Sequence, residues 1–370
     1  MVSTESKGKP VAIDLFAGGG GLTVGLQKAG FLVSGAVEYD STACDTYSEN
    51  HKGVVLFRRD IRSVSGEELI NTSPTGRIDL IAACPPCQGF SSLTSKYKRD
   101  DPRNELIFEF VRLVEEICPA TIMMENVPGL ADKGSKIFNA ACLRLEAAGY
   151  SLNHDVVDVA DYGIPQRRRR LVLLGSRSQE LSIPAPTHAR EPTADRAAWR
   201  TVREVIENFP EPISLAQARR DGGPEHFGWH IVREMSAENV KRLMALGEGQ
   251  NRSHLPKSLR PECHKASDKG FANVYGRMGW DGPSPTITGG CATLSKGRFG
   301  HPRAVRTISV REAACLQTFP LTYRFRSNYI DKVCSIIGNA LPPDFAAAMA
   351  RVCANSIARE DLNVNEGLSA

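Results

Sequence analysis

The sequence predicts an α/β protein in which a doubly wound, Rossmann-like sheet is joined to a small, irregular α+β insert. Over the first 180 residues, short apolar runs alternate with helical patterns, which is typical of a parallel sheet covered by helices. From about residue 176 this alternation stops, and prolines and glycines become frequent. The 370 residues, 41% of them hydrophobic, supply enough apolar material for one large core or two smaller ones.

The strands of the predicted sheet are short apolar runs. Five runs are expected as strands: Val11–Phe16, Leu32–Glu38, Ile78–Ala83, Thr121–Glu125 and Leu171–Leu174. A further apolar segment, Val54–Phe57, lies between the second and the third of them. Helices are expected at Leu22–Ala29, which Gly30 ends, and at Glu105–Ile117, where apolar side chains recur at helical spacing before Pro119.

The insert and the end of the chain do not show the alternation of strand and helix patterns. One helix is expected at Ala237–Leu246, and the glycine- and proline-rich stretch 271–290 suits short strands and tight turns. Helical patterns return at Val310–Leu316 and at Phe345–Ile357, the second after two prolines that suit a first helical turn.

Composition excludes several classes of protein. A chain with 41% hydrophobic and 24% charged residues is not disordered, and no run approaches the roughly 18 apolar residues that cross a bilayer. The first residues, MVSTESKGKP, lack the apolar stretch of a secretory signal, so a cytoplasmic protein with no membrane partner is expected. The ten cysteines show no disulfide-like spacing, which predicts free thiols.

The net charge of +4 is unevenly distributed along the chain. Residues 161–310 carry 24 Lys and Arg against 15 Asp and Glu, a net charge of +9, so the rest of the chain has a net charge of −5. Within this block, residues 251–310 hold 10 basic and 3 acidic side chains. Such an asymmetry suggests a polyanionic partner, and a solvated basic face without a partner is the alternative.

A glycine-rich loop follows the first strand. Residues 17–21 read AGGGG and lead into a helix, and this position at the carboxyl end of a parallel sheet suits a nucleotide-like ligand. No register of the loop matches G-x-G-x-x-G, which disfavours a dinucleotide pyrophosphate. Glu38, at the end of the second strand, could accept hydrogen bonds from a ribose diol, and Asp60 could bind an adenine amino group. An adenosine cofactor without phosphates fits this set; a plain strand-to-helix turn is the alternative.

Two cysteines separated by two prolines follow the Ile78–Ala83 strand. A zinc or redox site is disfavoured, because no second pair with metal spacing follows and Pro-Pro is a poor spacer for two metal ligands. Cys87, presented at the mouth of the sheet, is better interpreted as a nucleophile. An inert buried cysteine is the alternative.

A carboxylate and a run of arginines complete the candidate site. Glu125 ends a buried strand, where burial raises the pKa of an acid and suits it to share a proton with a ring nitrogen; a cap for the next loop is the alternative. Arg168 and Arg170 alternate within QRRRR and are expected to face the same way, either as fixed cations for an anionic oxygen and a phosphate or as a solvated edge.

Taken in this order, the motifs resemble those of the cytosine-5 DNA methyltransferase family, of the prokaryotic restriction-modification or orphan type. DLFAGGGGL is similar to its cofactor motif, VEYD to its acidic strand end, PPCQGFS to its nucleophile motif, ENV to its glutamate motif and QRRRR to its arginine motif. RTISVREAACLQTFP and GNALPP are similar to its two closing motifs. The resemblance covers about residues 1–175 and 306–357.

The resemblance implies a fold and a domain plan. Residues 1–175 would form the catalytic, cofactor-binding domain, which is Rossmann-like and depends on S-adenosylmethionine. Residues 176–305 would form the target recognition domain, in which PSPTITGG is similar to a threonine-containing segment of the family. Residues 306–360 would return to the catalytic domain, with their helix beside the first strand, and 361–370 would be a tail.

The resemblance also implies ligands. S-adenosylmethionine would be the cofactor, S-adenosylhomocysteine its product, and no metal would be needed. The residues expected around the cofactor are Phe16, Ala17, Gly18, Gly20, Gly21, Leu22, Glu38, Tyr39, Asp60, Ile61, Pro86, Leu106, Asn339 and Ala340. The residues expected to contact double-stranded DNA are Gln88, Gly89, Phe90, Ser91, Arg252, Arg277, Thr286 and Thr288. The chain is expected to be a monomer, and a separately acting restriction endonuclease is a further candidate partner.

The implied reaction is methylation of a flipped-out cytosine at C5. The Cys87 thiolate would add to C6 and make C5 nucleophilic. Glu125 would hold N3 and the exocyclic amine, Arg170 would bind O2, and Arg168 would steady the site and a phosphate.

Other functions are weighed beside this one. An RNA (tRNA) cytosine-5 methyltransferase would share the fold, but QGFSSL resembles the DNA enzymes. A catalytically silent DNA-binding module would not need Cys87, Glu125 and Arg170. A NAD-dependent enzyme would need the missing glycine fingerprint.

Overall fold

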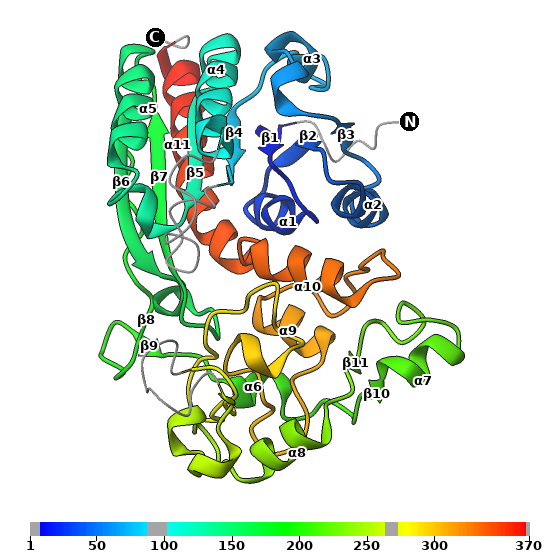
Figure 1. Cartoon of the computed structure of the whole chain (residues 1–370). Coiled ribbons are helices and arrows are strands. Elements are labelled where there is room, and N and C mark those ends of the chain that lie inside the picture. The colour runs from blue at the N-terminus through cyan, green and yellow to red at the C-terminus, as the bar shows by residue number, and fades with distance from the viewer. Residues whose placement is uncertain (1–7, 87–101, 263–272, 368–370) are drawn as a thin grey trace. The chain divides into compact units, whose positions relative to one another are not determined.

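The computed structural model describes residues 8–86, 102–262 and 273–367, which form two compact units (Figure 1). Unit 1 comprises Met1–Tyr162, Arg169–Pro186 and Leu341–Ala370, and unit 2 comprises Gly163–Arg168 and Thr187–Ala340. The chain therefore leaves unit 1 and returns to it. The return begins at Leu341, whereas the sequence placed it near residue 306.

Unit 1 is built on a seven-stranded mixed sheet with the strand order β3-β2-β1-β4-β5-β7-β6. The strands are β1 (Val11–Leu15), β2 (Leu32–Glu38), β3 (Val55–Arg58), β4 (Leu80–Ala83), β5 (Thr121–Asn126), β6 (Ser151–Asp158) and β7 (Arg169–Ser176). Neighbouring strands from β3 to β5 are parallel, and β7 runs antiparallel to both β5 and β6. This arrangement confirms the predicted doubly wound α/β fold.

Helices cover both faces of the sheet. They are α1 (Gly21–Lys28), α2 (Ser41–Asn50), α3 (Gly66–Ile70), α4 (Ile107–Ile117), α5 (Ser135–Ala147) and α11 (Pro343–Gly367). Short 3-10 turns lie at η2 (Ile61–Ser63), η4 (Pro102–Leu106), η5 (Pro128–Leu130) and η6 (Val159–Tyr162).

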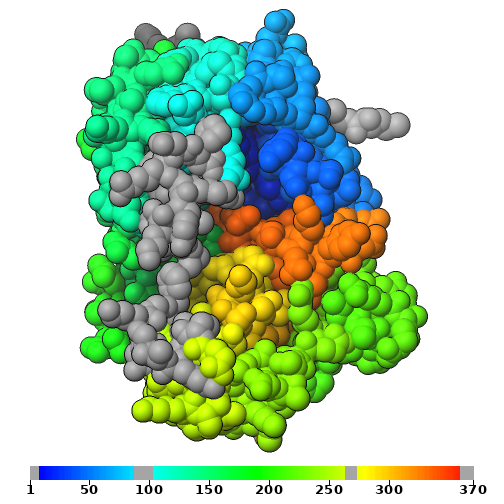
Figure 2. Space-filling model, viewed as in Figure 1, coloured from blue at the N-terminus to red at the C-terminus, as the bar shows by residue number. Residues whose placement is uncertain are grey.

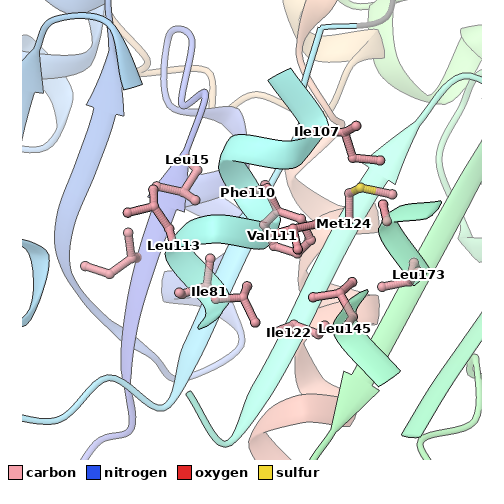
Figure 3. Close-up of a cluster of buried hydrophobic side chains, with 14 of the residues drawn as sticks. Leu15, Ile81, Ile107, Phe110, Val111, Leu113, Ile122, Met124, Leu145 and Leu173 are labelled. Carbon is pink, nitrogen blue, oxygen red and sulfur yellow. The ribbon is translucent and has the colours of Figure 1, made fainter. Parts of the chain in front are cut away.

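The main core of unit 1 lies between the sheet and α4 and α5 (Figure 3). Because side chains alternate across a strand, Leu15, Ile81 and Met124 face this core from β1, β4 and β5. Phe110 and Val111 of α4 meet them and are fully buried. Each such side chain stabilises the fold by roughly 1.5–3 kcal/mol relative to an exposed one.

The opposite face of the sheet is covered by α1, α2 and α11. The last of these helices packs mainly against α1 and also contacts β5 and η6. The backbones come close at Gly25 of α1, where a Cβ atom would lie 2.4 Å from the Cβ of Ala346 and 2.7 Å from the carbonyl oxygen of Pro343. A glycine is therefore required at this crossing.

One helical stretch, Ile330–Ala358, is long and apolar enough to cross a membrane. In its most apolar part, 72% is buried inside the protein, as in core helices.

The eight cysteines that lie in the described ranges are all free thiols, as expected.

Unit 2 contains short elements joined by turns. They are β8 (His188–Ala189), β9 (Ala197–Ala198), α6 (Val202–Ile206), β10 (Ile213–Ser214), α7 (Leu215–Arg220), β11 (Ile231–Val232), α8 (Ala237–Met244), η7 (Arg252–His254), η8 (Lys257–Leu259), η10 (Leu294–Lys296), α9 (Val310–Leu316) and α10 (Ile330–Asn339). The expectation of short strands at 271–290 is wrong for the described part, 273–290, which has turns and isolated bridges instead. Its glycines and prolines favour turns over a ladder of hydrogen bonds.

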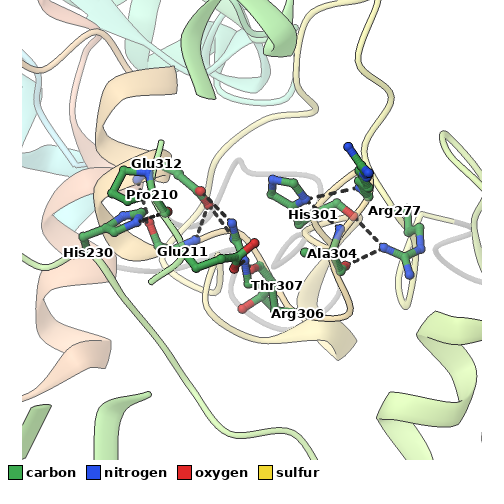
Figure 4. Close-up of polar contacts among 11 residues, drawn as sticks. Pro210, Glu211, His230, Arg277, His301, Ala304, Arg306, Thr307 and Glu312 are labelled. Atoms are coloured by element: carbon green, nitrogen blue, oxygen red, sulfur yellow. Dashed lines mark hydrogen bonds and ion pairs between the residues drawn. The ribbon is translucent and has the colours of Figure 1, made fainter. Parts of the chain in front are cut away.

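Polar contacts hold this irregular unit together (Figure 4). Arg306 donates to both carboxylate oxygens of Glu312, at 2.9 and 3.0 Å, and Glu312 also accepts from the backbone N–H of Ser309. His230 joins Ser309 to the carbonyl of Pro210. The buried charge of Glu312 is thus paired and hydrogen-bonded, which a charge inside a protein requires.

Candidate active site

The loop after β1 turns tightly and carries almost no side chains. Phe16, Gly18 and Gly20 all have positive φ angles, and the N–H of Gly20 closes the turn onto the carbonyl of Ala17 at 2.9 Å. In the space-filling view, the dark blue atoms of this first segment are recessed between lighter blue and cyan atoms of the same unit (Figure 2). The loop can therefore bring backbone atoms close to a ligand.

Glu38 is fixed beside this loop by three backbone donors. One carboxylate oxygen accepts from Gly18 at 2.8 Å, and the other accepts from Tyr39 and Asp40, both at 2.8 Å. A carboxylate has about four lone-pair sites, so about one is left for a ligand hydroxyl. Because the Gly18 N–H is occupied by a carboxylate, it is not available to bind a phosphate. The site fits an uncharged ribose better than a pyrophosphate.

Most of the other predicted cofactor residues lie at the same edge of unit 1. Tyr39 follows β2 and is 74% exposed, and Asp60 follows β3, caps η2 and pairs with Arg62. The remaining predicted residues at the ends of β1, β3 and β4 or at the start of α1 and α4 are Phe16, Ala17, Gly18, Gly20, Gly21, Leu22, Ile61, Pro86 and Leu106. Asn339 and Ala340 lie in unit 2, so their proximity to a cofactor stays a prediction.

Asp14 is a buried acid that the sequence did not single out. Its Oδ2 accepts from the Thr23 hydroxyl at 2.6 Å, and that hydroxyl also contacts the Tyr47 hydroxyl at 2.8 Å. Its Oδ1 is buried and has no hydrogen-bond partner within the part of the chain that the structure describes. Burial, helped by the charge of the nearby Glu38 and opposed by the hydrogen bond from Thr23, raises the pKa of Asp14 to about 7.

Glu125 and Arg170 form an ion pair on one face of the sheet. Glu125 lies opposite Val172 in the antiparallel pair of β5 and β7, so Arg170, two residues from Val172, is its diagonal neighbour on the same face. The Nε of Arg170 contacts Oε1 of Glu125, and both side chains are about nine-tenths buried. Burial lowers the pKa of Arg170, and the charge of Glu125 opposes this shift.

Cys84 lies beside this ion pair, whereas the sequence reasoning considered it only as a possible metal or redox partner of Cys87. Ala83 pairs with Met124, so Cys84 and Glu125 are the next residues along two adjacent parallel strands. Burial raises the pKa of the Cys84 thiol well above its usual value, and the charges of Glu125 and Asp14 raise it further. Strand alternation could have revealed this residue, because Cys84, Glu125 and Arg170 all point away from the main core.

The strand that carries Glu125 also holds the segment that leads to Cys87. The amide of Asn126 donates to the carbonyl of Pro85 at 3.0 Å, and both groups are buried. Sequence reasoning quoted Asn126 only as part of a motif and gave it no role. The predicted nucleophile Cys87 and the predicted DNA contacts Gln88, Gly89, Phe90 and Ser91 lie outside the described residues.

Arg168 does not occupy the position expected of it. Its side chain is 4% exposed and donates to the carbonyls of Ile287, at 2.9 Å, and Gly338, at 3.0 Å, all within unit 2. Buried carbonyl groups need donors, and a guanidinium supplies five. Arg168 thus holds unit 2 together, and the expectation that it steadies a phosphate is corrected.

The two arginines predicted to contact DNA are also buried. Arg277 is 5% exposed and donates to the carbonyls of Leu243, Leu246, His301 and Ala304 (Figure 4). Arg252 is 2% exposed. Both are structural residues of unit 2, because a side chain enclosed in this way cannot reach a base edge or a phosphate.

Two threonines predicted to contact DNA are partly buried. The hydroxyl of Thr286 donates to the carbonyl of Arg167 at 2.7 Å, and that of Thr288 accepts from the N–H of Gly290 at 3.3 Å. The backbone N–H of Ile287, between them, donates to the side chain of Gln166. The segment that contains both threonines is therefore anchored to the arginine motif.

Comparison with known proteins decides the family. A family model described as C-5 cytosine-specific DNA methylase matches residues 11–355. The chain belongs to this family. It is therefore a DNA cytosine-5 methyltransferase, and the α/β sheet, the glycine loop and the Glu125–Arg170 pair are parts of this methylase.

Named relatives support the assignment. The methylase is 39% identical to the type II methylase M.HgiDII of Herpetosiphon aurantiacus over 94% of each chain. It is 31% identical to the type II methyltransferase M1.BsuMI of Bacillus subtilis, over 91% of this chain and 78% of that one.

Solved structures share the fold. A prophage-encoded protein of E. coli, proposed as a DNA modification methyltransferase, has a TM-score of 0.70 and 26% identity, covering 94% of this chain and 99% of its own. The Dnmt2 methyltransferase of S. pombe has a TM-score of 0.64, with the same coverage of each chain, but only 16% identity, and so supports the fold alone.

Proposed function

We propose that this methylase modifies one short sequence in duplex DNA, through a covalent bond from Cys87, with S-adenosylmethionine as the methyl donor. The observation that carries this proposal is the buried Glu125–Arg170 pair, which lies beside the strand leading to Cys87. A carboxylate and a guanidinium held side by side match N3 and O2 of cytosine, which are neighbouring polar atoms of one ring. The names of the type II relatives further support a modification role next to a separate endonuclease.

The residues of unit 1 fit this cofactor. Glu38, held by backbone donors, would accept from the ribose, and Asp60 would meet the adenine amino group. Carboxylates around the loop also suit a positively charged sulfonium ligand, and Glu38 already occupies the N–H that a phosphate would need. When bound, S-adenosylmethionine would supply an electrophilic methyl group for C5.

Three side chains of the protein activate the cytosine for methylation. The thiolate sulfur of Cys87 bonds to C6, and the electrons of the C5–C6 double bond move so that C5 becomes nucleophilic. Glu125 holds N3 and the exocyclic amine and so favours the ring that is protonated at N3, and Arg170 stabilises charge on O2. After methylation, water or another base takes the C5 proton, the C5–H electron pair re-forms the C5–C6 double bond, and the C6–S bond breaks with its electron pair returning to sulfur.

The proposal also implies a location and binding partners for the protein. We expect a monomer in the cytoplasm, bound to duplex DNA and to no membrane. The target base and its context would be given by bisulfite sequencing of DNA from cells that express the methylase.

The covalent step can be tested with two cysteines of one motif. On a duplex with 5-fluorocytosine at the target, the wild type should form a complex that resists denaturant, because fluorine on C5 cannot leave as the proton does. Cys87→Ala should form none and lose methyl transfer, by roughly 10⁴-fold or more, as removed nucleophiles do. Cys84→Ser is the matched control and should still form the complex. A trapped complex with Cys87→Ala would overturn the proposal.

A further inference from the structure

The backbone around Cys84 is held on both sides by neighbouring strands of unit 1. Its N–H donates to the carbonyl of Leu15 in β1 at 3.3 Å, and the carbonyl of the next residue, Pro85, accepts from the buried amide of Asn126 in β5 at 3.0 Å. A proline also restricts the residue before it to extended backbone. Cys84 is therefore fixed between the strand that leads into the glycine loop and the strand that carries Glu125.

The thiol of Cys84 contacts the carboxylate of Glu125. Because Ala83 pairs with Met124, Cys84 and Glu125 are neighbours at the ends of two adjacent parallel strands, on the face of the sheet that points away from the main core. The thiol is hydrogen-bonded to this carboxylate, and its pKa is raised well above the usual value by burial first and then by the charge of Glu125. The sulfur therefore keeps its proton near neutral pH and is the donor of this hydrogen bond.

The remaining hydrogen-bonding capacity of Glu125 matches one edge of a cytosine ring. In the part of the chain that the structure describes, its carboxylate is contacted by the Nε of Arg170 and by the thiol of Cys84. A carboxylate has about four lone-pair sites, so about two are left for a ligand. A cytosine protonated at N3 presents two donors along one edge, the N3–H and an N–H of the exocyclic amine. A carboxylate that two partners already orient also loses little conformational freedom when it binds them.

We propose that Cys84 is a positioning residue for the target base, because its thiol holds the carboxylate of Glu125 in the orientation that accepts from N3 and the exocyclic amine of the cytosine. Cys84 acts through Glu125 and does not itself contact the base. This inference rests on the proposed function, since it needs Glu125 to be the residue that holds the base. A thiol suits this role because it is a weak donor, which orients the carboxylate without neutralising its charge as a second cation would.

Two substitutions of Cys84 separate the hydrogen bond from packing. Cys84→Ala removes the donor, whereas Cys84→Ser keeps a donor in a side chain that is also smaller than cysteine. The readout is the rate of a single turnover on a duplex with the target site, at saturating S-adenosylmethionine. Cys84→Ala should be roughly tenfold slower than the wild type, and Cys84→Ser should stay within about threefold of it. A wild-type rate in Cys84→Ala, or equally slow turnover in the two variants, would overturn the proposal.

Binding to altered target bases tests whether Cys84 acts through Glu125. Uracil has a carbonyl oxygen in place of the exocyclic amine, so an oriented carboxylate disfavours it. With S-adenosylhomocysteine present, the affinity for a cytosine target relative to a uracil target should fall roughly fivefold in Cys84→Ala and stay unchanged in Cys84→Ser. The mismatch made by uracil is the same for every protein and cancels in this comparison. An unchanged relative affinity in Cys84→Ala would contradict the proposal.

An abasic target and a second substitution sharpen this test. A duplex without the target base offers nothing to Glu125, so the wild type and Cys84→Ala should bind it equally well. In a Glu125→Ala background, Cys84→Ala should not change the relative affinity for cytosine and uracil any further. Weaker binding of the abasic duplex by Cys84→Ala, or a further change in the Glu125→Ala background, would show that Cys84 acts on another part of the protein.

Controls separate this inference from its basis. Cys142→Ala removes a partly buried thiol that packs on the main core and should keep the wild-type rate; an equal loss there would remove the special role of Cys84. Thermal unfolding checks the fold of each variant. Binding of S-adenosylhomocysteine should be unchanged in Cys84→Ala, and a tenfold loss would place the effect at the cofactor loop instead. If the wild type does not methylate the duplex, the proposed function fails; if it does and Cys84→Ala matches it in both rate and relative affinity, the inference alone fails.

Discussion

The central strands β1, β4, β5 and β7 bring four titratable side chains to one face of the sheet in unit 1. Asp14 of β1, Cys84 after β4, Glu125 of β5 and Arg170 of β7 all point away from the main core. Arg170 is the single cation among these four, and it pairs with Glu125. Burial is the main cause of the raised pKa values of Asp14 and Cys84, and nearby negative charge adds to it, from Glu38 for Asp14 and from Glu125 and Asp14 for Cys84.

Asp14 should make the stability of the methylase depend on pH. Burial raises its folded pKa to about 7, while an unfolded chain has about 3.9. A carboxyl group whose folded pKa is the higher one binds its proton more tightly when folded, so stability falls as pH rises from about 4 to about 7. The unfolding free energy of wild type minus that of Asp14→Asn should therefore decrease by about 1–3 kcal/mol between pH 5 and pH 8.

Urea unfolding at the two pH values, at constant ionic strength, measures this difference. Asp155→Asn removes the same charge from an exposed side chain of β6 and controls for a general change in net charge. A constant difference between wild type and Asp14→Asn at pH 5 and pH 8 would contradict the assigned pKa.

Among the elements, the close crossing of α1 and α11 has the sharpest steric requirement. Gly25→Ala adds a Cβ atom where backbone and side-chain atoms of α11 lie within 3 Å, so the helices must separate. Overpacking of this kind costs about 1–3 kcal/mol of unfolding free energy. Gly53→Ala is the matched control, because a Cβ there meets nothing within 4 Å, and it should change stability by less than about 1 kcal/mol. Equal unfolding midpoints in urea for the two variants would show that the crossing tolerates a methyl group.

Element prediction from the sequence succeeded where the apolar pattern was strong. Leu32–Glu38 and Val310–Leu316 were predicted with the bounds that β2 and α9 have. The edge strand β6 was missed, because none of its residues is buried and its sequence SLNHDVVD shows no apolar run. Helix α2, STACDTYSEN, was missed because the residues it buries, Ala43, Cys44, Thr46 and Tyr47, do not form a recognisable apolar pattern.

The candidate site could be predicted only in part. Motifs identified Glu125, Arg170 and Glu38, because each stands at a strand end that a pattern can locate. Burial of Arg168 and Arg277 could not be foreseen, since it depends on carbonyl groups far away in the chain, and nothing in the local sequence marked Arg252 as buried. Arg277, for example, binds carbonyls more than 20 residues away in both directions.

At the scale of the whole molecule, unit 1 is assembled from three separate segments of the chain. The last of them contributes α11, which packs on α1, contacts β5 and provides the Asp344 carboxylate that pairs with Lys28. A chain that ends at residue 340 should therefore fail to fold unit 1 and lose cofactor binding, while a chain that ends at residue 367 should keep both. Urea unfolding and equilibrium binding of S-adenosylhomocysteine measure the two properties. Wild-type cofactor affinity in the 340-residue chain would contradict this prediction.

The same three-segment assembly sets the order of events on the ribosome. Helix α1 leaves the exit tunnel roughly 300 residues before α11 does, which at about 5–20 residues per second is a delay of about 15–60 s. Throughout that interval the side of α1 that packs on α11 has no partner, although α1 can already contact β1 and β2. The nascent polypeptide therefore exposes this side of α1 until α11 has been synthesised, and the enzyme is not expected to methylate DNA before then.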